Sequence, residues 1–89
     1  MILRRGRFRL ISDILSAAKN PSTKTSIVYS ANLSFEQAQK YLDMLEEDGL
    51  LESHSSGHKK YKITEKGRKF LKTFRNLDGL LSELDVGSR

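Results

Sequence analysis

The sequence contains no cysteine, only one proline and no long apolar run. Without cysteine the chain can form neither a disulfide nor a thiolate metal site. Without a long apolar run it has no segment suited to crossing a bilayer, and the opening Met-Ile-Leu-Arg-Arg lacks the apolar core of a secretory signal. We therefore expect a soluble, cytoplasmic protein with no membrane partner.

Catalytic and cofactor motifs are also missing. We find no nucleophile spaced for a base, no glycine-rich phosphate loop and no cluster of metal ligands. His54 and His58 invite a metal-site interpretation, but no third ligand lies near them in the sequence, so we predict no metal there. The sequence predicts a protein that is not an enzyme and needs no cofactor.

Length and charge suggest a small domain with an anionic partner. The 89 residues suffice for one domain with a modest core. Sixteen Lys and Arg against 11 Asp and Glu give a net charge of +5, which favours an anionic partner. Basic residues gather at positions 4–9 and 59–75, whereas acidic residues cluster at positions 43–52. We therefore expect a polarised surface.

Residues 34–48 carry the clearest local signal. Ser34 and Gln37 have the spacing of a capping box, and Gly49 suits the left-handed end of a helix. Between these ends, apolar residues recur at intervals of three and four, which predicts a helix. The apolar face holds Ala38, Tyr41, Leu42 and Leu45. The opposite, exposed face holds Glu36, Lys40, Asp43 and Glu47.

A shorter predicted helix, residues 24–31, precedes it and is capped by Ser22 or Thr23. Only Asn32 and Leu33 separate the two helices. Asn tolerates the left-handed conformation of a tight turn, and Leu33 can fill the angle between the helices. The pair indicates a helix-turn-helix or, alternatively, an ordinary corner in a small helical domain.

The first predicted helix spans residues 7–19 and follows an arm of residues 1–6. Asn20-Pro21 ends it, because the residue before a proline is pushed out of the α region. Its apolar stripe is formed by Phe8, Leu10, Ile11, Ile14, Leu15 and Ala18.

Beyond Gly49, apolar and polar residues alternate on both sides of Ser55-Ser56-Gly57-His58. This period of two predicts a β-hairpin over residues 51–63, with these four residues at its tip. Thr64 then caps a final helix running to about Leu84. In this helix Gly67 permits close packing, and Gly79 marks either a kink or an early end. A coiled-coil seam is predicted from Phe70, Phe74, Leu77, Leu81 and Leu84.

Three helices, a hairpin with a basic tip and a final helix follow one another in the order of a winged helix-turn-helix domain, a mainly α (α+β) fold. In this fold the third helix is positioned to enter the major groove, and the hairpin, called the wing, is positioned to contact phosphates. We expect residues 1–66 to form the winged domain with its basic arm, and residues 67–89 to form a dimerisation helix and tail.

The chain also resembles small archaeal winged-helix proteins, including the 10a-type DNA-binding proteins of Sulfolobus. The resemblance rests on residues 7–15, 25–43, 49–51 and 61–67, and its most specific parts are Asn32-Leu33-Ser34 and Ile63-Thr64-Glu65-Lys66-Gly67. It implies DNA binding and a homodimer joined by an antiparallel coiled coil of the last helices. It also implies that some members are regulators and others chromatin-like proteins. Gly79 departs from the pattern of an uninterrupted coil.

The residues predicted to contact double-stranded DNA lie on several elements. Gln can pair with adenine, and Lys can bind guanine or phosphate. Acidic residues, which repel phosphate, gather at the carboxyl end of residues 34–48, so the amino-terminal end of this helix must enter the groove first. The predicted contacts are Lys24, Thr25, Ser34, Glu36, Gln37, Gln39, Lys40, His58, Lys59 and Lys60. Arg4, Arg5 and Arg7 form either a second DNA arm or a charged tail. A solvated face with a Glu36–Lys40 pair is the simpler alternative for the helix.

The sequence is consistent with three functions. The main hypothesis is a dimeric DNA-binding transcription regulator; the alternatives are a nucleoid or chromatin-like protein and a winged-helix module that docks on other proteins. The stripe from Phe70 to Leu84 can pack on its own domain or form the dimer seam. We favour the homodimer, because an exposed stripe of this size is unusual on a monomer.

Overall fold

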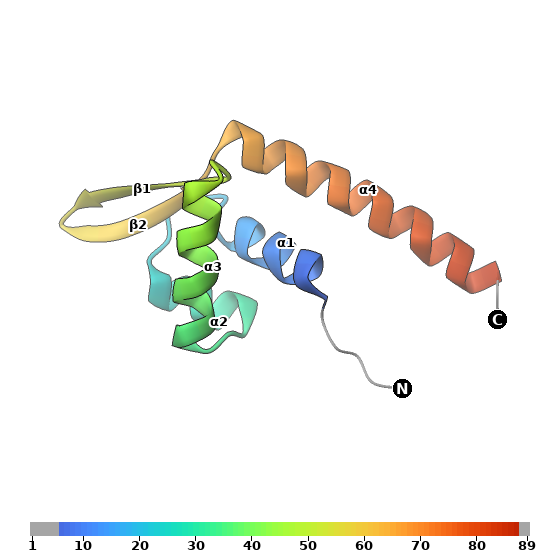
Figure 1. Ribbon diagram of the computed structural model, residues 1–89, viewed down its shortest axis with the longest axis horizontal. Helices are drawn as coiled ribbons and strands as arrows, with labels where there is room; N and C mark the ends of the chain where they lie inside the picture. The colour runs from blue at the N-terminus through green and yellow to red at the C-terminus, as the bar shows by residue number, and fades with distance from the viewer. Residues whose placement is uncertain (1–5, 88–89) are drawn as a thin grey trace.

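The computed structural model describes residues 6–87, with the side chains of residues 6–55 and 57–81. The elements follow in the order α1 (Arg7–Ala17), α2 (Lys24–Ala31), α3 (Phe35–Glu47), β1 (Leu51–Ser56), β2 (His58–Ile63) and α4 (Glu65–Gly87). In Figure 1 the helices α1, α2 and α3 form a body, from which the antiparallel hairpin extends on one side and α4 on the other. This confirms the predicted winged helix-turn-helix fold. None of the described helices is long and apolar enough to span a membrane.

The core lies between α1, α2 and α3 and is closed by the base of the hairpin. Its largest fully buried side chains are Ile14, Leu15, Ile27, Leu42, Leu45, Leu51 and Ile63. Phe8, the first residue of the predicted apolar stripe, does not join the core, because its side chain is 60% exposed. Phe8 stands in the first turn of α1, outside the core cluster, and its ring centroid lies 6.4 Å from that of Phe70 on α4.

Helix α1 ends at Ala17, two residues before the predicted end. Ala18 still donates its N–H to the carbonyls of Ile14 and Leu15, at 3.1 Å each, but the chain then turns toward the hairpin. The carbonyl of Ala18 accepts the N–H of Ile63 at 2.9 Å. The carbonyl of Ala18 is thus hydrogen-bonded to β2 instead of to a further turn of α1.

The helix-turn-helix forms as predicted. Thr23, rather than Ser22, caps α2, since its hydroxyl oxygen accepts the N–H of Ser26 at 3.2 Å. Asn32 adopts the left-handed conformation, with φ 56° and ψ 60°. Leu33 is buried in the turn between the two helices. Local chemistry therefore sets the angle at which α3 leaves α2.

The hairpin shows the predicted alternation, with Tyr61 and Ile63 buried and the lysines between and before them more exposed. Its tip is shorter than predicted. The strands pair as far as Ser56↔His58, so that Gly57, with φ 91°, is left alone at the turn. Because glycine has no Cβ, it adopts this conformation without strain.

Helix α4 begins against the end of α3. The hydroxyl oxygen of Thr64 accepts the N–H of Gly67 at 3.1 Å, which confirms the predicted cap. A Cβ on Gly67 would lie 2.3 Å from the carbonyl oxygen of Leu50 and 2.7 Å from Cγ1 of Ile63. The absence of a side chain therefore allows α4 to pack closely on the chain that joins α3 to the wing.

Gly79 does not end α4, which continues to Gly87, three residues past the predicted end. A Cβ at Gly79 would meet no atom within 4 Å. Gly67 and Gly79 therefore have different roles, although their effect on helix propensity is the same.

This difference predicts opposite effects of one substitution. Gly67→Ala should lower the free energy of unfolding by at least about 2 kcal/mol, because the new methyl group meets a backbone carbonyl. Gly79→Ala should raise it by up to about 1 kcal/mol, because alanine favours the helix and meets no neighbour. Urea denaturation followed by circular dichroism measures both. Equal effects of the two substitutions would contradict the packing described for Gly67.

Candidate nucleic-acid interface

The amino-terminal end of α3 is held by the predicted capping box. The N–H of Gln37 donates to Oγ of Ser34 at 3.0 Å, and the N–H of Ser34 donates to Oε1 of Gln37 at 3.4 Å. Both side chains are exposed. Because the cap uses their acceptor oxygens, Ser34 and Gln37 can meet a ligand chiefly as donors, through a hydroxyl proton and an amide NH2 group.

A chain of side-chain hydrogen bonds joins the start of α2 to the middle of α3. Nζ of Lys24 donates to Oε1 of Gln39 at 2.7 Å, and Nε2 of Gln39 donates to Oδ1 of Asp43 at 2.8 Å. The same ammonium lies 5.9 Å from the ring centroid of Phe35. Gln39 is therefore engaged within the protein, and its contact with a base would require this chain to rearrange. Thr25, the next residue of α2, is exposed.

The outer face of α3 is mixed in charge. Glu36 and Lys40 are exposed, and among the described side chains they form no ion pair with each other. The Glu36–Lys40 pair expected in the alternative interpretation, a solvated face, is therefore not formed. Asp43 and Glu47 follow on the same face and are exposed. Positive charge is thus available only toward the amino-terminal half of the helix.

The wing presents His58, Lys59 and Lys60, all exposed on β2. Nζ of Lys59 lies 5.3 Å from the ring centroid of Tyr61, an arrangement that orients the ammonium by a cation–π attraction. On the facing strand His54 approaches Glu52, with 3.3 Å between Nε2 and Oε2. Among the described residues no group of three ligand side chains is placed to hold a metal ion.

Backbone hydrogen bonds tie the wing to the helix-turn-helix. The N–H of Ser22 donates to the carbonyl of Tyr61 at 2.9 Å, and the N–H of Tyr61 donates to the carbonyl of Ser22 at 2.7 Å. On the other strand, Oγ of Ser53 donates to a carboxylate oxygen of Glu46 on α3. The start of α2, the helix α3 and the wing are therefore held in one fixed arrangement.

The structure does not bring every predicted residue to this arrangement. Arg7 is exposed at the first position of α1. Figure 1 shows α1 beginning on the side of the molecule away from the hairpin. Arg4 and Arg5 lie outside the described residues. Arg7 is thus separated from the wing by the body of the domain.

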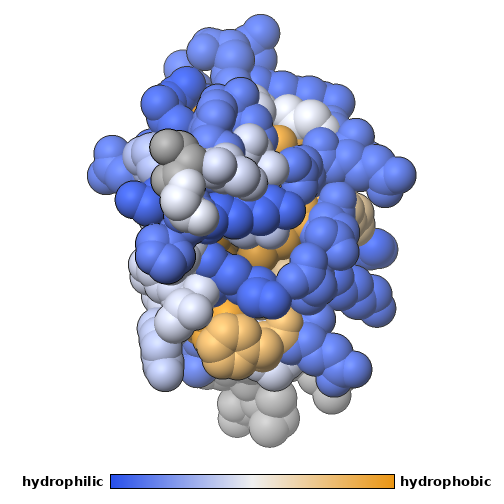
Figure 2. Space-filling view, turned by 90° about the vertical axis from the view of Figure 1, so that its left-hand side faces the viewer, coloured by the Kyte–Doolittle hydropathy of each residue, from blue (hydrophilic) through white to orange (hydrophobic). Residues whose placement is uncertain are grey.

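Two exposed aromatic residues were missed by the sequence analysis. Tyr29 on α2 is 78% exposed, and Phe35 at the start of α3 is 50% exposed. Phe35 stands seven residues before Leu42, on the edge of the apolar stripe of its helix, so the apolar period gave no signal that it is exposed. Figure 2 shows the face with the wing tip, where hydrophilic side chains surround a smaller hydrophobic area.

The fold and this arrangement define a winged helix-turn-helix protein. The chain belongs to the family described as Winged helix-turn-helix, whose family model matches residues 4–82. In sequence it is similar to an uncharacterized protein of Methanocaldococcus jannaschii, with 32% identity over 75 residues, covering 83% of this chain and 74% of that protein.

Solved structures agree with this assignment. The crystal structure of Sso10a-2, a DNA-binding protein from Sulfolobus solfataricus, is similar with a TM-score of 0.88 and 29% identity, covering 94% of this chain and 90% of that one. The transcriptional regulator BldR of the same organism has a TM-score of 0.71 and 25% identity, covering 84% and 58%. MepR of Staphylococcus aureus, a regulator at 14% identity, shares the fold with a TM-score of 0.76, covering 92% and 62%.

The capping box leads to a prediction about Ser34. Ser34→Ala should lower the free energy of unfolding by about 1 kcal/mol, because the N–H of Gln37 loses its partner. Ser34→Asp should leave stability near that of the parent, because a carboxylate also caps a helix and suits its positive end. Thermal denaturation of the two variants side by side tests this. If Ser34→Asp were as unstable as Ser34→Ala, the hydroxyl would have a role other than the cap.

Proposed function

We propose that this protein is a dimeric double-stranded DNA-binding protein that acts as a transcription regulator, with α3 in the major groove and the wing on the phosphate backbone. The observation that carries the proposal is that hydrogen bonds join the start of α2, the helix α3 and the wing, the three parts proposed to face DNA. Lys24 joins α2 to α3 through Gln39, and Ser22 joins α2 to the wing through Tyr61. A groove and its flanking phosphates have fixed spacing, so a rigid arrangement suits them.

The charges determine how α3 would enter the groove. Lys40 lies in the amino-terminal half, whereas Asp43, Glu47 and Asp48 would repel phosphates. The amino-terminal end therefore leads, with Ser34 and Gln37 as donors to base edges or phosphate. The start of α2, with Lys24 and Thr25, lies beside α3 and supplies a helix amino terminus, which attracts phosphate.

Two of the compared proteins support this proposal. Sso10a-2 is named as a DNA-binding protein and BldR as a transcriptional regulator. The first of these names also favours a second candidate function, a nucleoid or chromatin-like protein in the cytoplasm, because it states DNA binding without regulation. We propose no catalytic role for the chain, in keeping with its family.

The second part of the proposal is the homodimer, built from residues 67–89. Leu77, Leu80 and Leu81 are 52–59% exposed on α4. Figure 1 shows α4 extending beyond the body formed by α1, α2 and α3. Phe70 and Phe74, at the start of the same stripe, are half-buried. The predicted seam residue Leu84 lies outside the described side chains. An apolar stripe of this extent would be covered by the same stripe of a second copy.

The charge pattern along α4 favours an antiparallel pair. The first half of the helix is basic, with Lys66, Arg68, Lys69, Lys72 and Arg75. The second half is acidic, with Asp78, Glu83 and Asp85. In an antiparallel pair each basic half faces an acidic half, whereas a parallel pair places like charges together.

Lys40→Ala and Lys59→Ala should each weaken binding to duplex DNA without changing the fold, and each lost phosphate contact should lower the salt slope by about 1. Fluorescence anisotropy of a labelled duplex at several salt concentrations measures this. Lys69→Ala is the matched control, since it removes the same charge from α4, outside α3 and the wing. Parent-like affinity in both test variants would place DNA on another surface.

Leu77→Glu should convert the dimer to a monomer, because the seam would have to bury a carboxylate at its centre. Light scattering coupled to size-exclusion chromatography gives the mass directly. Asn76→Glu adds the same charge one residue earlier, on another side of the helix, and should remain dimeric. A Leu77→Glu variant that stays dimeric would refute the seam.

A further inference from the structure

A cleft of about 410 Å³ lies where α4 passes over the end of α1 and the end of β2. Its floor is apolar, because Ile63 from β2 and Leu71 from α4 line it and are both buried among core residues. Clefts of this size and character can hold a small organic molecule. Among the described side chains, none of those predicted for DNA contact or for the seam lines it.

Cationic side chains surround this apolar floor. They are Lys19, Arg68, Lys72 and Arg75. Their aliphatic stems extend the apolar wall while their charged groups lie at its edge. Asn76 completes the lining, and no acidic residue of the described part of the chain lines the cleft. The lining therefore combines an apolar surface with positive charge only.

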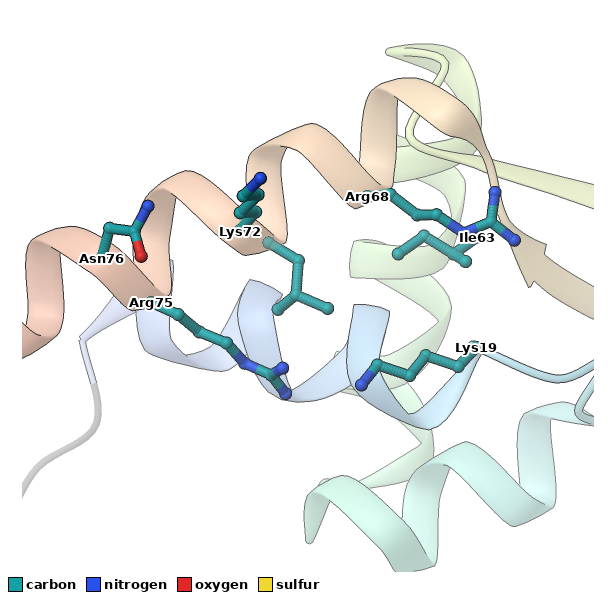
Figure 3. Close-up of a pocket in the computed structure, with 7 residues that line it drawn as sticks. Lys19, Ile63, Arg68, Lys72, Arg75 and Asn76 are labelled. Carbon is teal, nitrogen blue, oxygen red and sulfur yellow. The ribbon is translucent and has the colours of Figure 1, made fainter.

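Two of these cations approach each other across the cleft. Figure 3 shows Lys19 extending from the turn after α1 toward Arg75, which reaches from α4 toward α1. Nη2 of Arg75 donates to Oγ of Ser16 at 2.9 Å, which holds the guanidinium on the α1 side. The two positive charges repel each other when nothing lies between them. An anion bound between Lys19 and Arg75 would relieve this repulsion and would be attracted by both.

The cleft is also separate from the proposed dimer seam. With about 100° of rotation per residue, the seam positions Phe70, Phe74, Leu77 and Leu81 fall within about 60° of one another around α4. Arg68, Lys72 and Arg75 lie about 140–200° from Phe70 on the same scale. A second copy on the seam would therefore leave the cleft open to solvent.

We propose that this cleft binds a small amphiphilic organic anion. Its apolar, ring-sized body would lie on Ile63 and Leu71, and its single carboxylate or sulfonate would lie between Lys19 and Arg75. A nucleic-acid phosphate supplies the charge but no apolar body to cover the floor. The bound anion would contact α1, β2 and α4 together, at the base of the wing, and would stabilise their junction.

The test uses the fluorescent probe 8-anilinonaphthalene-1-sulfonate and its uncharged counterpart N-phenyl-1-naphthylamine. The sulfonate should bind once per chain, roughly tenfold or more tighter than the uncharged probe, as expected for a charge-assisted hydrogen bond. Lys19→Glu and Arg75→Glu should each weaken the sulfonate roughly tenfold and leave the uncharged probe unchanged. The matched control is Lys69→Glu, an exposed position of α4 outside the cleft, which should bind as the parent does.

The outcomes separate the alternatives. Binding of the uncharged probe shows whether the cleft persists in each variant. If Lys19→Glu abolishes binding of the uncharged probe, Arg75→Glu is the deciding variant. Unchanged sulfonate affinity in the deciding variant overturns the proposal. Equal loss in Lys69→Glu also overturns it, because the probe would then respond to overall charge or bind the leucine stripe. So does displacement of the probe by a DNA duplex together with weakened duplex binding by Lys19→Glu, since nucleic acid would then occupy the cleft.

Discussion

The arrangement of this protein depends on the close contact between Gly67 and the carbonyl of Leu50. At that point the end of α3, both ends of the hairpin and the start of α4 meet. The carbonyl of Leu50 also accepts the N–H of Thr64 at 3.1 Å, and the hydroxyl of Thr64 donates to the carbonyl of Gly49 at 2.6 Å. Any side chain at Gly67 would push α4 away from this junction, and the cleft beside α4 would change with it.

The junction also ends α3. The N–H of Leu50 donates to the carbonyl of Leu45 at 2.8 Å and that of Gly49 to Glu46 at 3.1 Å, the pattern of a Schellman motif. Nζ of Lys66 on α4 donates to the carbonyl of Asp48 at 2.8 Å, a cation at the negative end of a helix. The acidic end of α3 is thus directed toward basic α4, which leaves its amino-terminal end for the proposed DNA contact.

Features governed by neighbouring residues could be predicted from the sequence. The capping box of Ser34 and Gln37 and the left-handed Asn32 each depend on a few consecutive residues. Features governed by distant residues could not. The early end of α1 depends on Ile63, whose N–H donates to the carbonyl of Ala18. The exposure of Phe8 depends on how far α1 extends past the core. The engagement of Gln39 by Lys24 likewise requires two helices to be placed first.

By itself, the sequence determined the order of the elements, their caps and the segregation of charge, because periodicity, capping and composition act over a few residues. It therefore determined the fold class and the family resemblance. Only the tertiary structure decided which charged side chains are engaged and which are free. It joined Lys24 to Gln39, left Lys40 exposed, and brought Lys19 and Arg75 to one cleft. These pairs come from separate elements, and their distances exist only once the core has packed those elements together.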